Sequence, residues 1–421
     1  MLDIRLIRED HERVKTGARN KNESCDLDKI LELDEQRREI IRTVGKLKAE
    51  RNVASADIAK KKKSGESAHE AIAETRTLGD EIKSQDDSLR EIEEQLNGLL
   101  SWVPNLPHES APIGKDESAN VQVREWGEKS QPEFKLLPHW EIGEKLGILD
   151  LEAGAAVSGS GFYILKKQGA ALHRALVNYM LDTHAADGFT EFQLPYLVTS
   201  ETMYGTGQLP KLAGDMYHVE ADDLYLIPTA EVPLTNIYKK QIIALDDLPV
   251  YMVAHTPCFR REAGAAGKDT RGMIRVHQFD KVELVKIVHP EESYRELEAL
   301  VLQAEKVLQG LKLPYRVCEL ATGDLSFAAA KCYDIELWAG GVEKYLEISS
   351  VSNFESFQAR RMNLRFRGAD KKVEFPHTLN GSGVALARLI PAILENYQNE
   401  DASVTIPEVL RPYLRGAERI E

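Results

Sequence analysis

The chain has 421 residues, of which 43% are hydrophobic and 29% are charged. At roughly 100–200 residues per domain, this length predicts two or three domains with a large core, and the composition excludes a mostly disordered or collagen-like chain. The formal net charge of -14 argues against nonspecific nucleic-acid binding by the whole surface, although basic residues clustered on one element can still bind a polyanion.

The sequence carries no signal that would send the chain to a membrane or out of the cell. No apolar run approaches the roughly 20 residues of a membrane helix, and residues 1–10 alternate charged with apolar side chains instead of forming a signal peptide. The few cysteines are too widely spaced for a disulfide scaffold; they are Cys25, Cys258, Cys318 and Cys332. We therefore expect a cytoplasmic protein without a membrane partner.

The first hundred residues predict a separate helical domain. No proline precedes Val103, whereas prolines at 104, 107 and 112 mark a linker, which divides the chain into residues 1–103 and 104–421. Two series of mostly apolar residues, here called seams, are spaced alternately three and four residues apart. This spacing is typical of a two-helix coiled coil. The seams are Ile30, Leu33, Arg37, Ile40, Val44, Leu47, Arg51, Ala54 and Ile58, and then Leu78, Ile82, Gln85, Leu89, Ile92, Leu96 and Leu99.

A basic turn separates the two seams. Four lysines at 60–63 precede Gly65, which can end the first helix, and Ser67, which can cap the second. The pattern predicts an antiparallel hairpin whose helices are each on the order of 50 Å long. One interpretation is a coiled coil for dimerisation or spacing, and the other is an arm that contacts phosphates of a large anionic partner. Basic residues on the shaft that favour the second interpretation are Arg37, Arg38 and Arg42.

Residues 250–285 hold the richest set of chemical groups. Two strand-like runs at 251–262 and 273–284, joined by a small-residue loop, predict an antiparallel hairpin. Strand alternation places Arg260 and Glu262 on one face of the first run, and Phe279 and Glu283 on one face of the second. An arginine fork fits a phosphate, a carboxylate accepts from an exocyclic amine, and a phenylalanine ring stacks on a purine. The hairpin therefore predicts an ATP-binding surface on a sheet.

The string Phe259-Arg260, then Glu262, then Arg275 and His277-Gln278-Phe279 resembles motif 2 of class II aminoacyl-tRNA synthetases. The longer strings at 256–264 and 269–279 are most similar to the seryl-tRNA synthetase family of bacterial type. Further similarities to that family span the chain; they lie at 2–8, in the helical arm, and at 229–231, 347–354, 378–388 and 406–413.

The resemblance implies an α+β fold. An N-terminal antiparallel coiled-coil arm would bind tRNA, and a class II aminoacylation domain would contain a mainly antiparallel sheet flanked by helices, among them the helical patterns at 292–311 and 384–397. It further implies ATP-dependent activation of L-serine to seryl-adenylate and transfer to the 3′ end of serine tRNA, with selenocysteine tRNA as a further substrate. Such a serine–tRNA ligase forms AMP and diphosphate. Pro195 resembles the motif 1 proline, which implies a homodimer.

The resemblance also assigns residues to ATP and magnesium. The expected catalytic residues are Arg260 and Arg388. The expected ATP-binding residues are Arg260, Arg261, Glu262, Val276, Phe279, Glu347, Ile348, Ser349, Ser350 and Arg388. Hard oxygen donors suit Mg²⁺, and the expected ligands are Glu347 and Ser350. Strict strand alternation would place those two on opposite faces, so we expect the strand to bend or end there.

The substrate serine requires a pocket with buried polar partners. Recognition of a hydroxyl group depends on such partners, because alanine would leave them unpaired. The residues that match the family's serine site are Thr229, Ala230, Glu231, Glu283, Asn380 and Ser382.

Other interpretations remain open at this stage. Another class II synthetase, for threonine or proline, is disfavoured by the loop at 229–231 and by the arm. A synthetase-like chain that has lost activation is disfavoured by the joint presence of Arg260, Glu262, Glu347 and Arg388. A purely structural coiled-coil protein leaves three hundred residues unexplained. Purely structural roles are the alternatives for individual residues: an ion pair between Arg260 and Glu262, core packing of Phe279, and a helix-surface position for Arg388.

Overall fold

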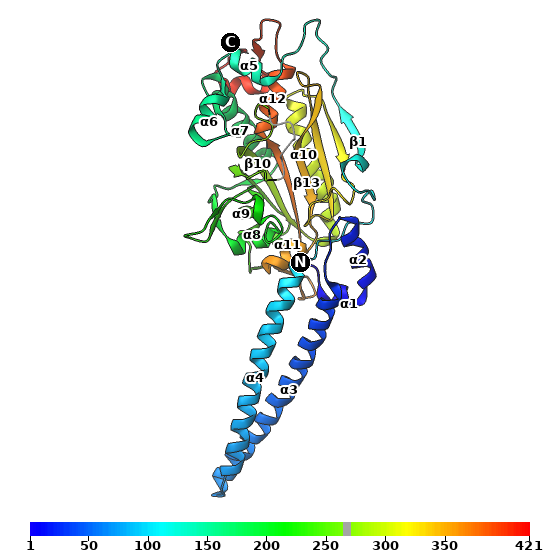
Figure 1. Ribbon diagram of the computed structural model, residues 1–421, viewed down its shortest axis with the longest axis vertical. Coiled ribbons are helices and arrows are strands. Elements are labelled where there is room, and N and C mark those ends of the chain that lie inside the picture. Colours follow the sequence, from blue (N-terminus) through cyan, green and yellow to red (C-terminus); the bar gives the residue numbers. More distant parts are fainter. Residues whose placement is uncertain (264–270) are drawn as a thin grey trace. The chain divides into compact units, whose positions relative to one another are not determined.

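The computed structural model describes residues 1–263 and 271–421, which separate into two compact units (Figure 1). The first unit comprises residues 1–19 and 23–104, and the second comprises residues 20–22 and 105–421. Residues 264–270, the glycine-rich part of the loop expected between the two strand-like runs, lie outside the described residues.

The first unit is helical and confirms the predicted hairpin. Its long helices, α3 (Leu27–Ser64) and α4 (His69–Leu100), pack against each other and follow the short helices α1 (Ile4–Glu9) and α2 (His11–Asn20). Every residue of both seams is buried or half-buried. Ion pairs cross between the long helices, such as Arg37 with Glu93 at 2.9 Å. The alternating three- and four-residue steps therefore identified the packed face.

The turn at the tip confirms one predicted cap and corrects the other. Gly65 ends α3 in the left-handed conformation, with φ of 77°, and its N–H donates to the carbonyl of Lys61. The prediction that Ser67 caps α4 is wrong, because Ala68 precedes the first helical residue, His69, and makes no side-chain capping bond. A capping side chain must belong to the residue that directly flanks the helix in order to reach its first free N–H groups.

An eight-stranded sheet forms the centre of the second unit. All of its neighbouring pairs are antiparallel except β4 with β9, which is parallel. In spatial order the strands are β1 (Val121–Trp126), β11 (Tyr315–Glu319), β12 (Lys331–Ala339), β13 (Lys344–Asn353), β16 (His377–Ala385), β10 (Gln278–Val288), β9 (Val250–Phe259) and β4 (Thr190–Glu191). The mainly antiparallel sheet agrees with the predicted fold.

Shorter elements surround this sheet. The remaining strands are β2 (Leu149–Asp150), β3 (Ile164–Leu165), β5 (Leu197–Thr199), β6 (His218–Val219), β7 (Leu224–Leu226), β8 (Ile242–Ala244), β14 (Arg365–Arg367), β15 (Val373–Glu374), β17 (Val404–Thr405) and β18 (Arg419–Ile420). The helices are α5 (His139–Lys145), α6 (Leu151–Ser158), α7 (Gln168–Ala186), α8 (Ser200–Thr206), α9 (Glu231–Asn236), α10 (Ser293–Gly310), α11 (Phe357–Met362) and α12 (Leu386–Asn396).

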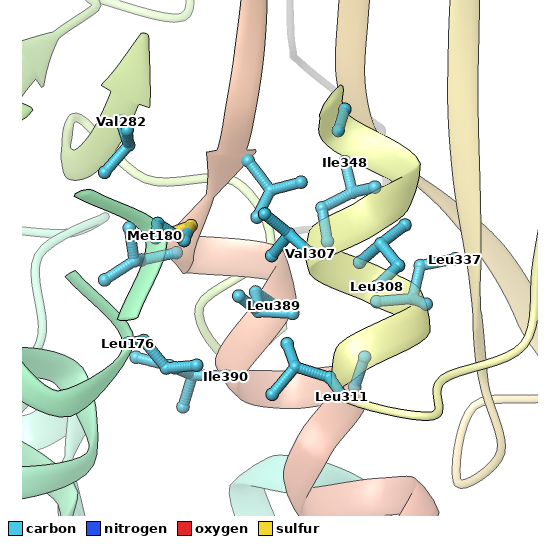
Figure 2. Close-up of a cluster of buried hydrophobic side chains, with 14 of the residues drawn as sticks. Leu176, Met180, Val282, Val307, Leu308, Leu311, Leu337, Ile348, Leu389 and Ile390 are labelled. Carbon is cyan, nitrogen blue, oxygen red and sulfur yellow. The ribbon is translucent and has the colours of Figure 1, made fainter. Parts of the chain in front are cut away.

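The main hydrophobic core lies between the sheet and three helices. Helices α7, α10 and α12 and strands of the sheet contribute the buried side chains in Figure 2, where Met180, Val307 and Leu389 of the three helices point toward one another. Both helical patterns predicted to cover the sheet, at 292–311 and 384–397, correspond to α10 and α12. Across the described residues, no helix is both long and apolar enough to span a bilayer.

A buried lysine ties three segments of the second unit together. The ammonium group of Lys21, a residue that is only 5% exposed, donates to the backbone carbonyls of Asn105, Phe327 and Ala329 at 3.2, 3.1 and 2.8 Å. Carbonyl oxygens compensate much of the cost of removing the ammonium group from water.

Candidate active site

The register of the sheet brings the expected site residues onto one face. Directly opposed residues on neighbouring strands point to the same side of a sheet. In β10 and β16, Glu283 lies opposite Ser382, and Asn380 in turn lies opposite Ser352 of β13. On the other side of β10, Phe279 lies opposite Cys258 of β9. The alternation of β10 therefore presents Phe279 and Glu283 together, as predicted.

The ends of the β9–β10 hairpin differ from the prediction. Strand β9 ends at Phe259 and β10 begins at Gln278, so the ladder is shorter at this end than the runs 251–262 and 273–284. The expectation that Arg260 and Glu262 share a strand face is wrong, because both follow the last ladder residue and Glu262 has a positive φ of 51°. Alternation of side chains holds only within extended backbone. The carboxylate of Glu262 instead pairs with Arg275 at 3.3 Å.

Arg260 links the aromatic residue to the loop at 228–231. Its guanidinium carbon lies 5.2 Å from the centre of the Phe279 ring, and its Nε donates to the carbonyl of Pro228 at 3.3 Å. Its backbone N–H donates to the carbonyl of His277 at 2.9 Å, which fixes the residue just past the end of the ladder. A cation and an aromatic ring thus lie next to the loop at 228–231.

A bulge in β13 places Glu347 and Ser350 on one face. Glu336 of β12 pairs with Glu347, but its neighbour Ile335 pairs with Ser349, so Ile348 is an extra residue. A bulge of this kind shifts side-chain alternation by one position. Since Ser350 opposes Asp334, which shares a face with Glu336, the expected bend is confirmed. The side chain of Ile348 lies in the hydrophobic core (Figure 2).

The oxygen atoms on this face fit part of a magnesium site. Ser350 Oγ lies 3.1 Å from Cys332 Sγ, and the carboxylate of Glu347 is half-exposed. Burial, followed by the negative charge of nearby Glu347, raises the pKa of Asp334 well above its usual range. No group of three or more His, Cys, Asp or Glu side chains within residues 1–263 and 271–421 is placed to hold a metal. Phosphate oxygens would therefore have to complete the coordination of Mg²⁺ by Glu347 and Ser350.

Arg388 lies on α12 and reaches this segment. Its NH1 donates to the backbone carbonyl of Glu347 at 2.5 Å and lies 3.5 Å from the carboxylate of the same residue. The expected helical location is confirmed. The guanidinium group consequently stands beside the oxygen atoms that would face a polyphosphate, where an arginine fork neutralises charge effectively.

A cluster of buried polar side chains continues along β10 and β16. Glu231 is 6% exposed and Glu283 is fully buried. Glu231 accepts a hydrogen bond from Gln358 of α11 at 2.7 Å, and Glu283 accepts one from Asn380 at 3.1 Å. Burial, followed by the charge of Glu283, raises the pKa of Glu231 to about 7. Two buried carboxylates thus lie close enough for the charge of one to affect the other.

This cluster retains an unused acceptor of the kind that a small polar substrate would satisfy. Among the described residues, Asn380 Oδ1 is buried without a hydrogen-bond partner. Such an atom is costly unless a ligand or water donates to it. Asn380 lies opposite Ser352 of β13, which is two residues from Ser350 on the same face of that strand. The polar face is therefore continuous from the loop at 229–231 to the bulged segment of β13.

The side chains of three expected residues lie in the core or in solvent, and two residues of the polar cluster were not predicted. The side chain of Val276 belongs to the core, Ala230 is fully buried at the start of α9, and Arg261 is exposed. The sequence interpretation overlooked Gln358 and Lys281. Lys281 could have been found from its two-residue spacing to Phe279 and Glu283 in one strand, whereas Gln358 on a separate helix has no such signal.

Comparison with known proteins agrees with this architecture. Residues 217–397 match the tRNA synthetase class II core domain (G, H, P, S and T), so the sheet and its site define a class II aminoacyl-tRNA synthetase. Residues 1–107 match the seryl-tRNA synthetase N-terminal domain. A serine–tRNA ligase of Carboxydothermus hydrogenoformans is 54% identical over 100% of this chain and 99% of its own length. The chain belongs to the seryl-tRNA synthetase family.

Solved structures show the same fold over the full length. The seryl-tRNA synthetase from Pyrococcus horikoshii, complexed with ATP, has a TM-score of 0.92 and 40% identity, and covers 100% of this chain and 99% of its own. The cytoplasmic serine–tRNA ligase from Naegleria fowleri, in complex with AMP, has a TM-score of 0.88 and 30% identity at the same coverage. These matches exclude the purely structural coiled coil and favour the serine family over a threonine or proline enzyme.

Proposed function

We propose that this chain is a serine–tRNA ligase that activates L-serine with ATP to seryl-adenylate and transfers the seryl group to the 3′ end of serine tRNA. AMP and diphosphate are the other products. The observation that carries the proposal is the continuous polar face, which joins Arg260 through the loop at 228–231 to Glu283, Asn380 and the bulged segment of β13. One end suits a nucleotide and the other suits a small polar amino acid.

At the nucleotide end, Arg260 would hold the α-phosphate and Phe279 would stack on adenine. The guanidinium group already lies over the ring, so a phosphate and a base could be bound side by side. Glu262 would accept from the adenine amine after exchanging its bond to Arg275. Arg261, Val276, Ile348 and Ser349 would contribute mainly by their backbone groups, because their side chains are exposed or engaged elsewhere.

At the phosphate end, Arg388 would bind the γ-phosphate, and Glu347 and Ser350 would hold Mg²⁺. When bound, Mg²⁺ supplies positive charge that neutralises phosphate oxygens. Charge neutralisation and alignment of the attacking carboxylate account for most catalysis in a displacement of this type. Arg260 and Arg388 would act directly on the phosphates, so we assign the catalytic roles to them.

At the amino-acid end, Thr229, Glu231 and Glu283 would bind the ammonium and hydroxyl groups of serine. Ala230 would shape the loop through its backbone, and Asn380 and Ser382 would complete the pocket. The buried Asn380 Oδ1 needs a donor, which the serine hydroxyl or ammonium group provides. Alanine leaves such acceptors unpaired, and this loss is the physical basis of discrimination.

The helical arm would bind tRNA, and its four tip lysines support this assignment. We extend the proposal to selenocysteine tRNA, to a homodimer and to the cytoplasm. Family membership supports the selenocysteine tRNA and the homodimer. The motif 1 proline that implies the dimer, Pro195, follows β4, which is the edge strand of the sheet. The four cysteines are all free thiols, as suits a reducing compartment.

The decisive experiment is amino-acid-dependent ATP–pyrophosphate exchange without tRNA. Serine, threonine, alanine, glycine and proline are compared with the wild-type chain and with Arg260→Ala. We expect exchange with serine alone and a loss of about 1,000-fold in the variant, because a charge aimed at the reacting phosphate is removed. Arg295→Ala is the control, since this arginine of α10 is largely exposed and pairs only locally. Exchange with another amino acid would overturn the substrate, and no exchange with any would indicate a chain that has lost activation.

The role of the arm is tested separately with the four tip lysines changed to glutamine. We expect serine-dependent exchange to stay unchanged, whereas KM for serine tRNA in aminoacylation rises about tenfold and the salt dependence of this KM becomes shallower. An unchanged tRNA KM would remove the tip from the proposed interface. Aminoacylation of selenocysteine tRNA is measured in parallel with serine tRNA. Analytical ultracentrifugation measures whether the wild-type chain is a dimer.

A further inference from the structure

Lys281 is a buried cation within the cluster of polar side chains on β10 and β16. It lies in β10, between Phe279 and Glu283 on the same face, and is 6% exposed. Its ammonium group forms an ion pair with Glu283 and donates to Thr229 Oγ1 at 3.0 Å. It therefore joins two of the groups proposed to bind serine, one on the sheet and one on the loop before α9.

The charges around the pocket explain why a lysine is present. Glu231 and Glu283 are both buried, and Gln358, the hydrogen-bond partner of Glu231, is neutral. Two carboxylates in one enclosed site repel each other and hold protons more tightly, unless a cation balances them. Lys281 is the cation in direct contact with Glu283, and Arg260 adds positive charge near the loop.

The lysine differs from the other polar groups here because it can only donate hydrogen bonds. Its ammonium has three donors and no acceptor, and two of them are directed to Glu283 and Thr229. Each bond leaves the acceptor with lone pairs for the substrate, because a carboxylate and a hydroxyl both accept more than once. Without the lysine, Glu283 would be free to turn away from the position that a substrate donor requires.

We propose that Lys281 is a positioning residue for serine: its ammonium group holds Glu283 and Thr229 in place and keeps Glu283 able to accept from the substrate. This inference rests on the proposed activation of serine. It predicts that Lys281 governs binding of the amino acid, while ATP binding depends on Arg260, Phe279 and Arg388.

The chain provides a matched control in the same strand. Lys286 of β10 is 3% exposed and donates to Glu296 of α10 at 2.8 Å. It is also a buried lysine paired with a glutamate, but it lies five positions after Lys281, an odd offset, so it points to the opposite, helix-covered face. A general requirement for buried ion pairs would affect both lysines alike, whereas a role in the pocket would affect Lys281 alone.

The test compares Lys281→Met, Lys281→Arg and Lys286→Met by pyrophosphate exchange, with KM measured separately for serine and ATP. Lys281→Met should raise the serine KM roughly 10- to 100-fold, the range expected when a buried partner is lost, and leave the ATP KM within about twofold. Lys281→Arg retains the charge and should lie between wild type and Lys281→Met. Lys286→Met should lower the melting temperature without changing the serine KM.

Each other outcome has a defined meaning. An unchanged serine KM in Lys281→Met, an equal rise of the serine and ATP KM values, or the same KM pattern in Lys286→Met would overturn the inference. If Lys281→Met does not fold, Lys281→Arg and Lys286→Arg decide the question by the same split between serine and ATP. A wild-type chain without serine-dependent exchange would instead refute the proposed function, so the two failures are distinguishable.

Discussion

The helical arm and the catalytic sheet place their charged residues in opposite ways. Along α3 and α4 most charged side chains are exposed, and pairs such as Lys48 with Asp86 at 3.4 Å stay in contact with water. The sheet instead encloses Lys281 with Glu283 and Lys286 with Glu296. Exposed pairs contribute little to stability, whereas breaking a buried pair leaves an uncompensated charge. The arm should therefore tolerate charge changes that the sheet does not.

The largest effect is expected from a charge change in the catalytic unit, which should abolish most activity and leave the helices of the arm folded. Arg388→Ala removes the group that contacts Glu347 and, in our proposal, the γ-phosphate. Serine-dependent pyrophosphate exchange should fall about 100- to 1,000-fold, as for other groups that stabilise developing charge. Circular dichroism should show unchanged helix content. A loss of less than about tenfold would contradict a catalytic role for Arg388.

The next effect concerns pH and a buried acid of the sheet. The folded protein raises the pKa of Glu231 from 4.5 to about 7, so the folded state holds this proton more tightly than the unfolded chain. Its contribution to stability is complete below the unfolded pKa and is lost as pH rises through the folded one, which amounts to at most about 3 kcal/mol. In the wild-type chain this contribution makes the unfolding free energy decrease between about pH 5 and pH 8. Glu231→Gln should make that decrease smaller, as measured by urea unfolding.

An arm carboxylate provides the control for that measurement. Glu74 lies exposed on α4, so Glu74→Gln should leave the pH dependence of unfolding unchanged. If both variants flattened the curve equally, the titration could not be assigned to the buried site.

A smaller effect tests the packed face of the arm. Leu47 is 8% exposed on α3, whereas Val53 on the same helix is 72% exposed. Leu47→Ala should lower the unfolding free energy by about 2 kcal/mol, and Val53→Ala by less than about 0.5 kcal/mol. Urea unfolding followed by circular dichroism measures both, and equal effects would mean that the seam contributes no more than the exposed surface.

The smallest effect tests the turn between the two helices. Gly65 has a φ of 77° and an added Cβ would meet no neighbour, so Gly65→Ala should destabilise by about 1 kcal/mol through the backbone alone. Gly45 lies within α3 and is equally unobstructed, so Gly45→Ala should stabilise by a similar amount. Thermal melting should thus shift in opposite directions, and shifts of the same sign would be incompatible with a left-handed Gly65.

The features predicted from sequence are those that depend on neighbouring residues. The seams of α3 and α4 follow from a local period, and so does the shared face of Phe279 and Glu283. The need for a bend between Glu347 and Ser350 also followed from that period, because their spacing conflicted with strict alternation. Residue roles in the site came from resemblance to the family, and they remain predictions until the variants are measured.

The features that were missed depend on long-range register or on backbone conformation. Arg275 reaches Glu262 only because the chain leaves the ladder at Phe259, and no local pattern specifies that residue. Gln358 approaches Glu231 from a separate helix, more than a hundred residues away along the chain. Ser67 has the right chemistry for a cap but lies one residue too early. Propensity identifies suitable residue types, and tertiary packing selects the position.

The buried ammonium group of Lys21 has a consequence for synthesis of the chain. Two of its carbonyl partners, Phe327 and Ala329, are 306 and 308 residues further along. On the ribosome the helical hairpin can form as soon as it emerges, since its contacts are local. Lys21 can bind these two carbonyls only after a further three quarters of the protein has been translated. Translation at about 5–20 residues per second makes that interval tens of seconds. The first residues of the second unit are therefore among the last to complete their bonds.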